Sequence, residues 1–293
     1  MTYELHVLVV ETPSLTSSSS SAERNLESRL ELVQNAFPKH SYSRIPIHSI
    51  FKYDAEFGQV MAEFVSPSYV GDPSLPDEER LEAFCASRST STSKVDIDET
   101  LLRRLVVAYA KMLGCGAVMW GDSDTGLAAK TLASVAKGRG RSTTWQLSDG
   151  MSPWGVGFHF PLRDLFKAEI KDYACLVPNL HDFIIPEAPL SDDVLTKNLS
   201  IDALMTRYVN SQSEKYPTVM SNVARMVTKL DAGPTSTDAV LHCKFCGTFI
   251  GAIGGQSGGG KVSDDGTFNS SQSSSFCYGC ARSRQDAVKQ ASS

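Results

Sequence analysis

The chain has 293 residues, of which 41% are hydrophobic and 21% are charged, and its formal net charge is −5 at pH 7. This composition is typical of a globular protein, and the charge excludes a protein that binds nucleic acid over its whole surface. The sequence has no run of about 18 apolar residues, and its first residues lack a basic n-region, so we expect neither a membrane span nor a signal peptide. The odd number of cysteines, seven, fits a reducing compartment and predicts a cytoplasmic protein.

The first part of the chain predicts a strand, a helix and a second strand. The β-branched run from His6 to Val10 is typical of a buried strand, and 22–37 has apolar residues at helical spacing. Residues 42–51 alternate around three isoleucines, which predicts the second strand. This order is typical of a parallel sheet covered by helices. A short helix is expected at 78–85.

A longer helix is expected to begin at Asp96 and to end before Gly114. Asp96 with Glu99 makes a pattern similar to a capping box, and glycine is common just after a helix ends. The polar residues 87–94 before it are expected to be irregular, and 117–120 to form a short buried strand.

The turn after this strand carries a candidate ligand site, formed by Gly121, Asp122, Ser123 and Asp124. A helix is expected at 126–136, and a strand–turn–helix unit exposes backbone N–H groups at the edge of a sheet where α/β proteins bind nucleotides or phosphates. A plain turn is the alternative that these residues leave open.

The stretch 129–171 has seven lysines and arginines against three acidic residues. Such a local excess of positive charge could contact nucleic-acid phosphates, although a solvated face is the alternative and is favoured by charge alone. The candidate binding residues are Lys137, Arg139, Arg141 and Arg163.

Further elements are expected between this stretch and the C-terminal part. Residues 145–160 are rich in glycine and aromatic residues and are expected to be extended, and helices are expected to begin at Pro161, Ile201 and Pro217. These elements complete a domain predicted to span 1–230.

Two CxxC pairs near the C-terminus carry the strongest chemical signal, and their cysteines are Cys243, Cys246, Cys277 and Cys280. Each pair places two thiolates on one tight turn, and four soft ligands make a tetrahedral structural zinc site. His242 is an alternative ligand, and redox-active dithiols or disulfides are alternative chemistries. A linker at 231–236 is expected to join the domain to this module at 237–293, whose glycine- and serine-rich loop at about 254–275 is expected to be disordered.

Several short motifs together resemble one protein family. They are GDSDTGLAAKTL from Gly121, KGRG from Lys137, SPW from Ser152, PLRDL from Pro161, Pro217, and the CKFC and CYGC pairs. The combination resembles the cytoplasmic tRNA 2-thiolation protein 2 family, the partner subunit of the eukaryotic enzyme that places sulfur on C2 of the wobble uridine, position 34, of certain tRNAs. The resemblance covers 87–230 and the C-terminal cysteines strongly, and the residues before 87 more weakly.

The resemblance implies an α/β fold similar to the PP-loop ATPases, a Rossmann-like (HUP) parallel sheet with helices on both faces, followed by a zinc-ribbon-like module. It also implies a heterodimer with the catalytic thiolation subunit, and tRNA as a further partner. The catalytic partner would use ATP to adenylate the uridine, and sulfur would come from the thiocarboxylate of a ubiquitin-related modifier. Structural zinc is then the cofactor expected in this chain, and ATP is expected only in the catalytic partner.

The sequence departs from the family pattern at two places. It has no SGGxDS motif before Val10, so it begins at what resembles the second strand, without the first strand and PP-loop. The GHNxDD-type turn of the active enzymes appears at 121–124 without its histidine, as a vestigial nucleotide-facing turn. These departures favour a non-catalytic subunit that supports the catalytic one and helps to bind tRNA. The alternatives are an ATP-dependent tRNA sulfurtransferase, which would need Cys85 or Cys115 as its reactive cysteine, and an unrelated zinc-ribbon interaction protein.

Overall fold

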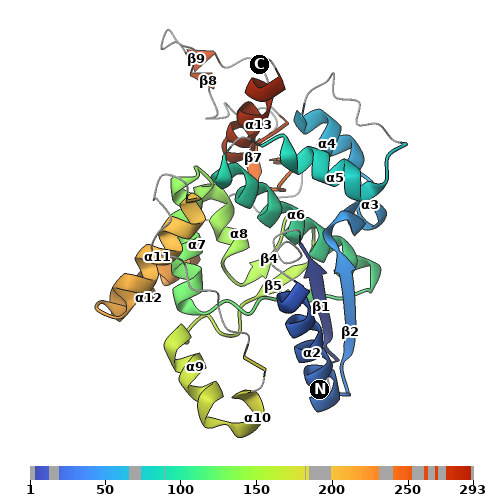
Figure 1. The fold of residues 1–293 in the computed structure, drawn as a ribbon. Coiled ribbons are helices and arrows are strands. Elements are labelled where there is room, and N and C mark those ends of the chain that lie inside the picture. Colours follow the sequence, from blue (N-terminus) through green and yellow to red (C-terminus); the bar gives the residue numbers. More distant parts are fainter. Residues whose placement is uncertain are drawn as a thin grey trace.

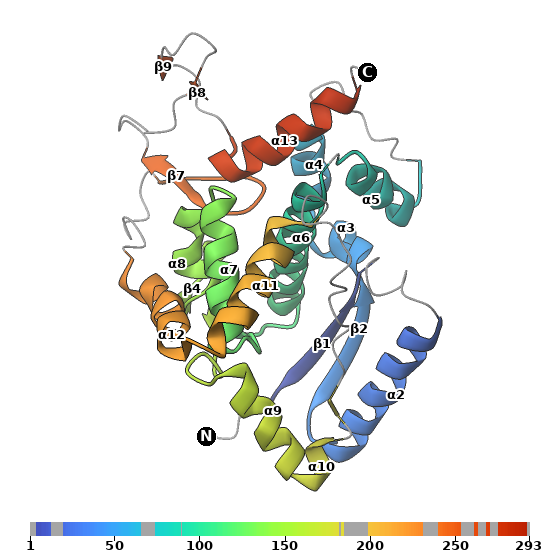
Figure 2. The same ribbon diagram turned by 60° about the vertical axis from the view of Figure 1, so that its left-hand side comes forward.

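The long helix α6 (Ser91–Met112) runs through the centre of the molecule, with helices and small sheets on both sides (Figure 1, Figure 2). Helices and parallel strands occur together, so the predicted α/β class is confirmed. This computed structural model describes residues 4–12, 20–65, 74–88, 90–181, 183–184, 199–230, 240–252, 261–262, 268–269 and 275–291.

The predicted strand–helix–strand unit is confirmed, but its first strand is half-buried along its length and not buried as expected. Strand β1 (His6–Glu11) pairs in parallel with β2 (Ser41–Pro46), and α2 (Ser20–Ala36) connects them. Helix α2 lies on the outer face of this pair (Figure 2). On the inner side Tyr109 of α6 donates a hydrogen bond to Ser43 Oγ at 2.8 Å, which ties α6 to β2.

The second predicted strand is shorter than its alternation suggested. It ends at Pro46, and a 3₁₀ turn (Ile47–Ser49) and helix α3 (Ile50–Tyr53) follow. Ile47 and Ile50 are buried in the core from these helical turns, because burial of the isoleucines does not require an extended backbone. Helices α4 (Phe57–Val65) and α5 (Asp77–Ala86) come next, and α5 confirms the helix predicted at 78–85.

The predicted start of the long helix was wrong. Helix α6 begins at Ser91, and Thr90 caps it by accepting a hydrogen bond from the backbone N–H of Ser93 at 3.1 Å. Asp96 therefore lies within the helix, where its buried carboxylate forms ion pairs. The predicted end is confirmed, since Gly114 follows the helix with φ of 71°.

The strand predicted at 117–120 is an edge strand. Strand β3 (Ala117–Met119) pairs in parallel with β5 (Gly157–His159), which pairs on its other side with β4 (Gly150–Met151). Only the central residue of β3 is half-buried, so the prediction of a buried strand was wrong. Part of the expected extended segment is instead the short helix α8 (Thr143–Gln146).

Three later helices, α9 (Lys167–Leu176), α11 (Ile201–Ser213) and α12 (Pro217–Met226), pack against α7 (Asp124–Ala136). The helix expected to begin at Pro161 begins later, as α9, because Pro161 and the residues after it form turns. Helices α11 and α12 confirm the last two predicted helices. The short helix α10 (Pro178–His181) follows α9.

Strand pairing in the described ranges gives two separate small sheets in this part of the chain, β1–β2 and β3–β5–β4. One continuous parallel sheet of the PP-loop type is not seen there. The two cores lie on either side of α6: Leu101 and Leu105 belong to one, and Val107 belongs to the other, which also contains Phe158.

Residues of the two cysteine pairs and the phenylalanines beside them belong to the first of these cores. Cys243, Phe245 and Phe276 are buried in one cluster with Phe64 of α4 and Leu101 of α6. The expected linker at 231–236 and most of the expected loop at 254–275 lie outside the described residues. The elements here are β6 (Val240–His242), β7 (Phe249–Ala252), β8 (Lys261–Val262), β9 (Phe268–Asn269) and α13 (Tyr278–Ala291). Among the described residues, no helix has the length and apolar character to cross a bilayer.

Candidate metal centre

The four cysteines of the two CxxC pairs meet at one point. Their Sγ atoms all lie within 4.8 Å of one another, and Cys246 Sγ is 3.5 Å from Cys277 Sγ. With Zn–S bonds of about 2.3 Å, a tetrahedral site needs sulfur–sulfur separations of about 3.8 Å. The donor set and its spacing therefore fit a tetrahedral zinc ion, whereas a disulfide would need a much shorter separation of about 2 Å.

Local backbone geometry explains how the first pair forms its turn. The carbonyl oxygen of Cys243 accepts from the N–H of Gly247 at 2.8 Å, and the N–H of Cys243 donates to the carbonyl oxygen of Thr248 at 2.8 Å. Gly247 has φ of 73°, a left-handed conformation that favours glycine. A Cβ atom there would also lie 3.0 Å from the ring of Trp154, so this turn packs closely against a residue outside the cysteine segment.

The second pair opens helix α13. Cys277 directly precedes the helix, Cys280 lies in its first turn, and the N–H of Ala281 donates to the carbonyl oxygen of Cys277 at 2.8 Å. Cys280 is fully buried. Between the pairs, the N–H of Lys244 donates to the carbonyl oxygen of Ser275 at 3.0 Å, which joins the two turns.

The alternative ligand His242 points elsewhere. Its Nδ1 atom lies 2.9 Å from the carbonyl oxygen of Gly247, and the group of potential metal ligands contains the four cysteines without it. Hydrogen bonds from the thiol of Cys243, then from Cys277, together with the charge of Arg139, lower the pKa of Cys246 well below its ordinary value. The surroundings therefore favour the thiolate at Cys246, whereas the hydrogen bond with Cys246 raises the pKa of Cys243 and burial raises that of Cys280.

A buried arginine contacts the cysteine cluster. Nη1 of Arg139 lies 3.4 Å from Cys280 Sγ and 3.9 Å from Cys277 Sγ. Its Nε and Nη2 atoms donate to the two carboxylate oxygens of Asp96 at 2.7 and 2.6 Å. Although burial opposes its charge, interaction with the sulfur of Cys280 and then with the carboxylate of Asp96 raises the pKa of Arg139 well above its ordinary value.

Two further buried arginines support the same segment. Nη1 of Arg104 donates to the carbonyl oxygens of Lys244 and Phe245 at 2.7 and 3.1 Å, and its Nη2 forms an ion pair with Asp54 at 2.6 Å. Nη1 of Arg88 donates to the carbonyl oxygen of Ser283 in α13 at 3.2 Å. The backbone around both cysteine pairs is therefore held by side chains from α6 and the residues before it.

The four candidate tRNA-binding residues occupy different environments. Lys137 and Arg139 are only 4% and 5% exposed, and both are ion-paired with Asp96. Arg141 is exposed and donates to the carbonyl oxygen of Ile250 at 3.4 Å. Arg163 is half-buried and pairs with Asp149 at 3.2 Å. Of the four, only Arg141 is exposed.

The candidate nucleotide-facing turn is stabilised from within. Ser123 caps helix α7 by accepting from the N–H of Gly126 at 3.3 Å. Asp122 pairs with Lys130 at 2.7 Å, and buried Asp124 accepts from the hydroxyl of Ser221 at 2.8 Å. Gly121 is exposed at the start of the turn. These side chains thus hold α7 and α12 in place.

Comparisons with known proteins identify the family. The family model described as cytoplasmic tRNA 2-thiolation protein 2 matches residues 200–257. A protein of that name from Neosartorya fischeri is 53% identical over 284 residues, which cover 97% of this chain and 74% of the relative. The chain belongs to the cytoplasmic tRNA 2-thiolation protein 2 family. Proteins of the same name from Aspergillus fumigatus and Emericella nidulans are 52% and 51% identical, with 75% and 83% of their lengths covered.

Family membership confirms the resemblance found in the sequence motifs and connects this chain to cytoplasmic tRNA 2-thiolation. The profile match at 200–257 contains α11, α12 and the first cysteine pair. The names of these relatives are those of cytoplasmic proteins, in agreement with the predicted compartment.

The sequence did not predict one residue beside the cysteine cluster. Asp96 was assigned to a helix cap, but its carboxylate joins Lys137 and Arg139. The signal that could have found it is the KGRG motif itself, because two cations flanking a left-handed glycine need an acidic partner when they are buried.

Proposed function

We propose that this chain is a non-catalytic subunit of the cytosolic complex that converts the wobble uridine at position 34 of certain tRNAs to 2-thiouridine. In this proposal it forms a heterodimer with the catalytic thiolation subunit, supports that subunit and contributes to tRNA binding. The catalytic subunit binds ATP and adenylates the uridine, and sulfur arrives as the thiocarboxylate of a ubiquitin-related modifier.

The observation that carries the non-catalytic role is the internal use of the turn at 121–124. A nucleotide-binding turn must direct its polar groups at phosphates or at a metal ion. Here Asp122 pairs with Lys130, and Asp124 accepts hydrogen bonds from Thr125 and Ser221. Because its carboxylates hold neighbouring helices, the turn supports a structural role in this chain.

The isolated cysteine Cys85 also supports a non-catalytic role. Burial, followed by the nearby carboxylate of Asp98, raises the pKa of Cys85 to about 12. At neutral pH Cys85 is therefore a protonated thiol, which is a poor nucleophile and a poor sulfur carrier. Of the seven cysteines, four lie in the cluster of the two CxxC pairs.

The zinc ion of this proposal is structural. Cys243, Cys246, Cys277 and Cys280 would hold it, and it would join the turn after β6 to the start of α13 as a cross-link. Four protein thiolates complete a tetrahedral coordination shell, which leaves no open position for substrate. The metal would therefore stabilise the fold and not take part in sulfur transfer.

Reconstitution with the catalytic subunit tests the proposal. We expect the purified chain alone to release no AMP from ATP in the presence of tRNA. We expect the two subunits together to form 2-thiouridine, seen as retarded tRNA in an organomercurial gel. Cys85→Ser and Cys115→Ser should leave the activity of the complex within twofold of the unsubstituted complex. AMP release by the isolated chain that depends on tRNA, or loss of thiolation in Cys85→Ser, would overturn the non-catalytic role.

A further inference from the structure

The KGRG and CYGC motifs fit into one another. Gly138, with φ of 75°, lies under the ring of Tyr278: a Cβ atom on Gly138 would be 2.5 Å from Tyr278 Cε1. In the opposite direction, a Cβ atom on Gly279 would be 2.6 Å from Arg139 Cγ. Each motif therefore uses its glycine to let a large side chain of the other approach, and this close approach brings Arg139 to the cysteine cluster.

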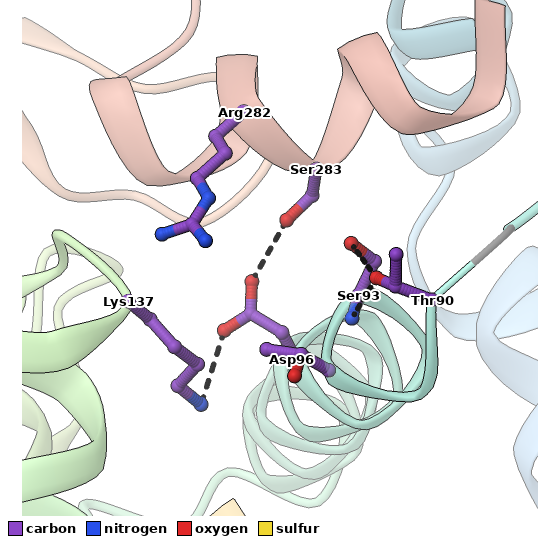
Figure 3. Close-up of a pocket in the computed structure, with 7 residues that line it drawn as sticks. Thr90, Ser93, Asp96, Lys137, Arg282 and Ser283 are labelled. Carbon is purple, nitrogen blue, oxygen red and sulfur yellow. Dashed lines mark hydrogen bonds and ion pairs between the residues drawn. The ribbon is translucent and has the colours of Figure 1, made fainter. Parts of the chain in front are cut away.

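Asp96 lies at the centre of the contacts behind this fit. Figure 3 shows its carboxylate between Lys137, which follows α7, and Ser283 of α13. Lys137 Nζ is 3.2 Å from Asp96 Oδ1, Ser283 donates to Oδ2 at 3.1 Å, and Arg139 donates to both oxygens. Lys137 also pairs with Asp202 of α11 at 2.6 Å. The carboxylate is only 4% exposed and joins α6, α7 and α13.

The electrostatics of the centre explain why a cation is placed there. A zinc ion with four thiolates carries a net charge of about −2, and burying such a charge is costly unless donors and positive charge face it. Arg139 meets this need with Nη1 directed at Cys280 and Cys277. Because Nε and Nη2 are occupied by Asp96, the guanidinium has one orientation. Lys137 balances the added carboxylate.

We propose that Arg139 stabilises the metal-bound form of the cysteine centre by charge and N–H···S hydrogen bonds, and that Asp96 is the positioning residue that orients it. This inference rests on the zinc centre proposed above. In this proposal the KGR sequence acts in the interior of the protein, where it is the partner of the metal site. Outer-shell partners of this kind change metal affinity by about 10- to 100-fold when they are removed.

The test measures metal retention in the full chain. Purified zinc-loaded protein is titrated with a chromophoric chelator, and the cobalt-substituted form is followed by its sulfur-to-cobalt charge-transfer absorption. The variants are Arg139→Gln, Arg139→Lys, Asp96→Asn and the double variant, and the exposed pair Arg225 and Asp164, joined at 3.3 Å, supplies Arg225→Gln and Asp164→Asn as matched controls. The cavity of about 190 Å³ beside Asp96 leaves room for the amide of Asp96→Asn and for water.

We expect Arg139→Gln to weaken zinc binding by about 10- to 100-fold and to shift the charge-transfer band to lower energy, because the thiolates lose the positively charged guanidinium donor. Arg139→Lys keeps a positive charge and should recover part of the affinity. Asp96→Asn alone should weaken binding less than Arg139→Gln does. In the Arg139→Gln background the same change should be neutral or favourable, since it removes a carboxylate left beside an anionic centre.

The outcomes separate this inference from the zinc proposal. Absence of zinc in the unsubstituted protein overturns the zinc centre, and this inference with it. One zinc per chain with affinity unchanged within twofold in Arg139→Gln overturns this inference alone. Losses that simply add in the double variant overturn the positioning role of Asp96. If Arg139→Gln does not fold, the test uses Arg139→Lys. An unshifted absorption band and an unchanged zinc affinity in Arg139→Lys then contradict the proposal.

Discussion

Phe245, between the cysteines of the first CxxC pair, stacks on Phe64 of α4 with ring centroids 4.3 Å apart and planes at 21°. Phe276, just before the second pair, meets the same Phe64 ring edge-on at 5.4 Å. Phe64, which lies outside the cysteine segment, thus contacts a residue beside each cysteine pair. The cysteine segment is packed on α4 and α6 as part of a common core.

This contact predicts that the metal segment and the first core unfold together. Phe245→Ala removes a fully buried ring and should lower the free energy of unfolding by about 3–5 kcal/mol. Chemical denaturation followed by circular dichroism measures the loss. The exposed aromatic Tyr216 offers a control, since Tyr216→Ala should change stability by about 0.5 kcal/mol or less. A second transition that Phe245→Ala shifts alone would contradict a common core.

Substitution of Gly279 by alanine should have two opposite effects on stability, one through helix propensity and one through steric contact. Gly279→Ala should favour helix α13 by up to about 1 kcal/mol through propensity. Its Cβ would however collide with Arg139 Cγ at 2.6 Å, and overpacking of this kind costs about 1–3 kcal/mol. We therefore expect a lower melting temperature and weaker zinc retention.

The matched control for this prediction is Gly116→Ala. A Cβ atom on Gly116 would meet no atom within 4 Å, so stability should change by about 0.5 kcal/mol or less. A Gly279→Ala variant that is as stable as wild type and retains zinc equally well would show that Arg139 can move away without consequence.

The sequence predicted elements well where the local pattern alone determines structure. The β1–α2–β2 unit, α5, α11 and α12 follow from periodicity and turn residues. Prediction from the sequence failed where a tertiary contact overrides a local preference. Asp96 has the local signature of a cap, but the buried cations Lys137 and Arg139 fix it inside α6, and Thr90 supplies the cap.

The candidate site was also predicted only where the local sequence pattern determines the structure. The CxxC spacing alone predicted which four cysteines meet, because each pair is a local turn with one geometry. The basic stretch was less informative, since charge density does not distinguish an exposed arginine from one paired in the interior. Arg139 and Arg141 are two residues apart, yet one contacts the cysteine cluster and the other is exposed.

Cysteine reactivity gives a pH-dependent prediction. The pKa of Cys85 is raised to about 12, chiefly by burial, so its thiolate is absent at pH 8 and its alkylation rate should keep rising with pH up to about 12. Iodoacetamide at pH 8 should modify exposed Cys175 first and Cys85 roughly a thousandfold more slowly, as measured by peptide mass spectrometry. Equal rates for the two cysteines would contradict the buried thiol and reopen a catalytic role for Cys85.

The exposed basic residue predicts where tRNA would be contacted. Arg141→Glu, which reverses an exposed charge, should weaken tRNA binding by the heterodimer, and the dependence of log K on log salt should lessen by about one or more. Arg163→Glu should have a smaller effect, because Arg163 is half-buried and paired with Asp149. Arg225→Glu on α12 is the control, being equally basic, 57% exposed and outside the stretch 129–171. Filter binding at several salt concentrations measures affinity and slope together. If Arg141→Glu and Arg225→Glu lower affinity equally, the effect is general charge and the basic stretch is only a solvated face.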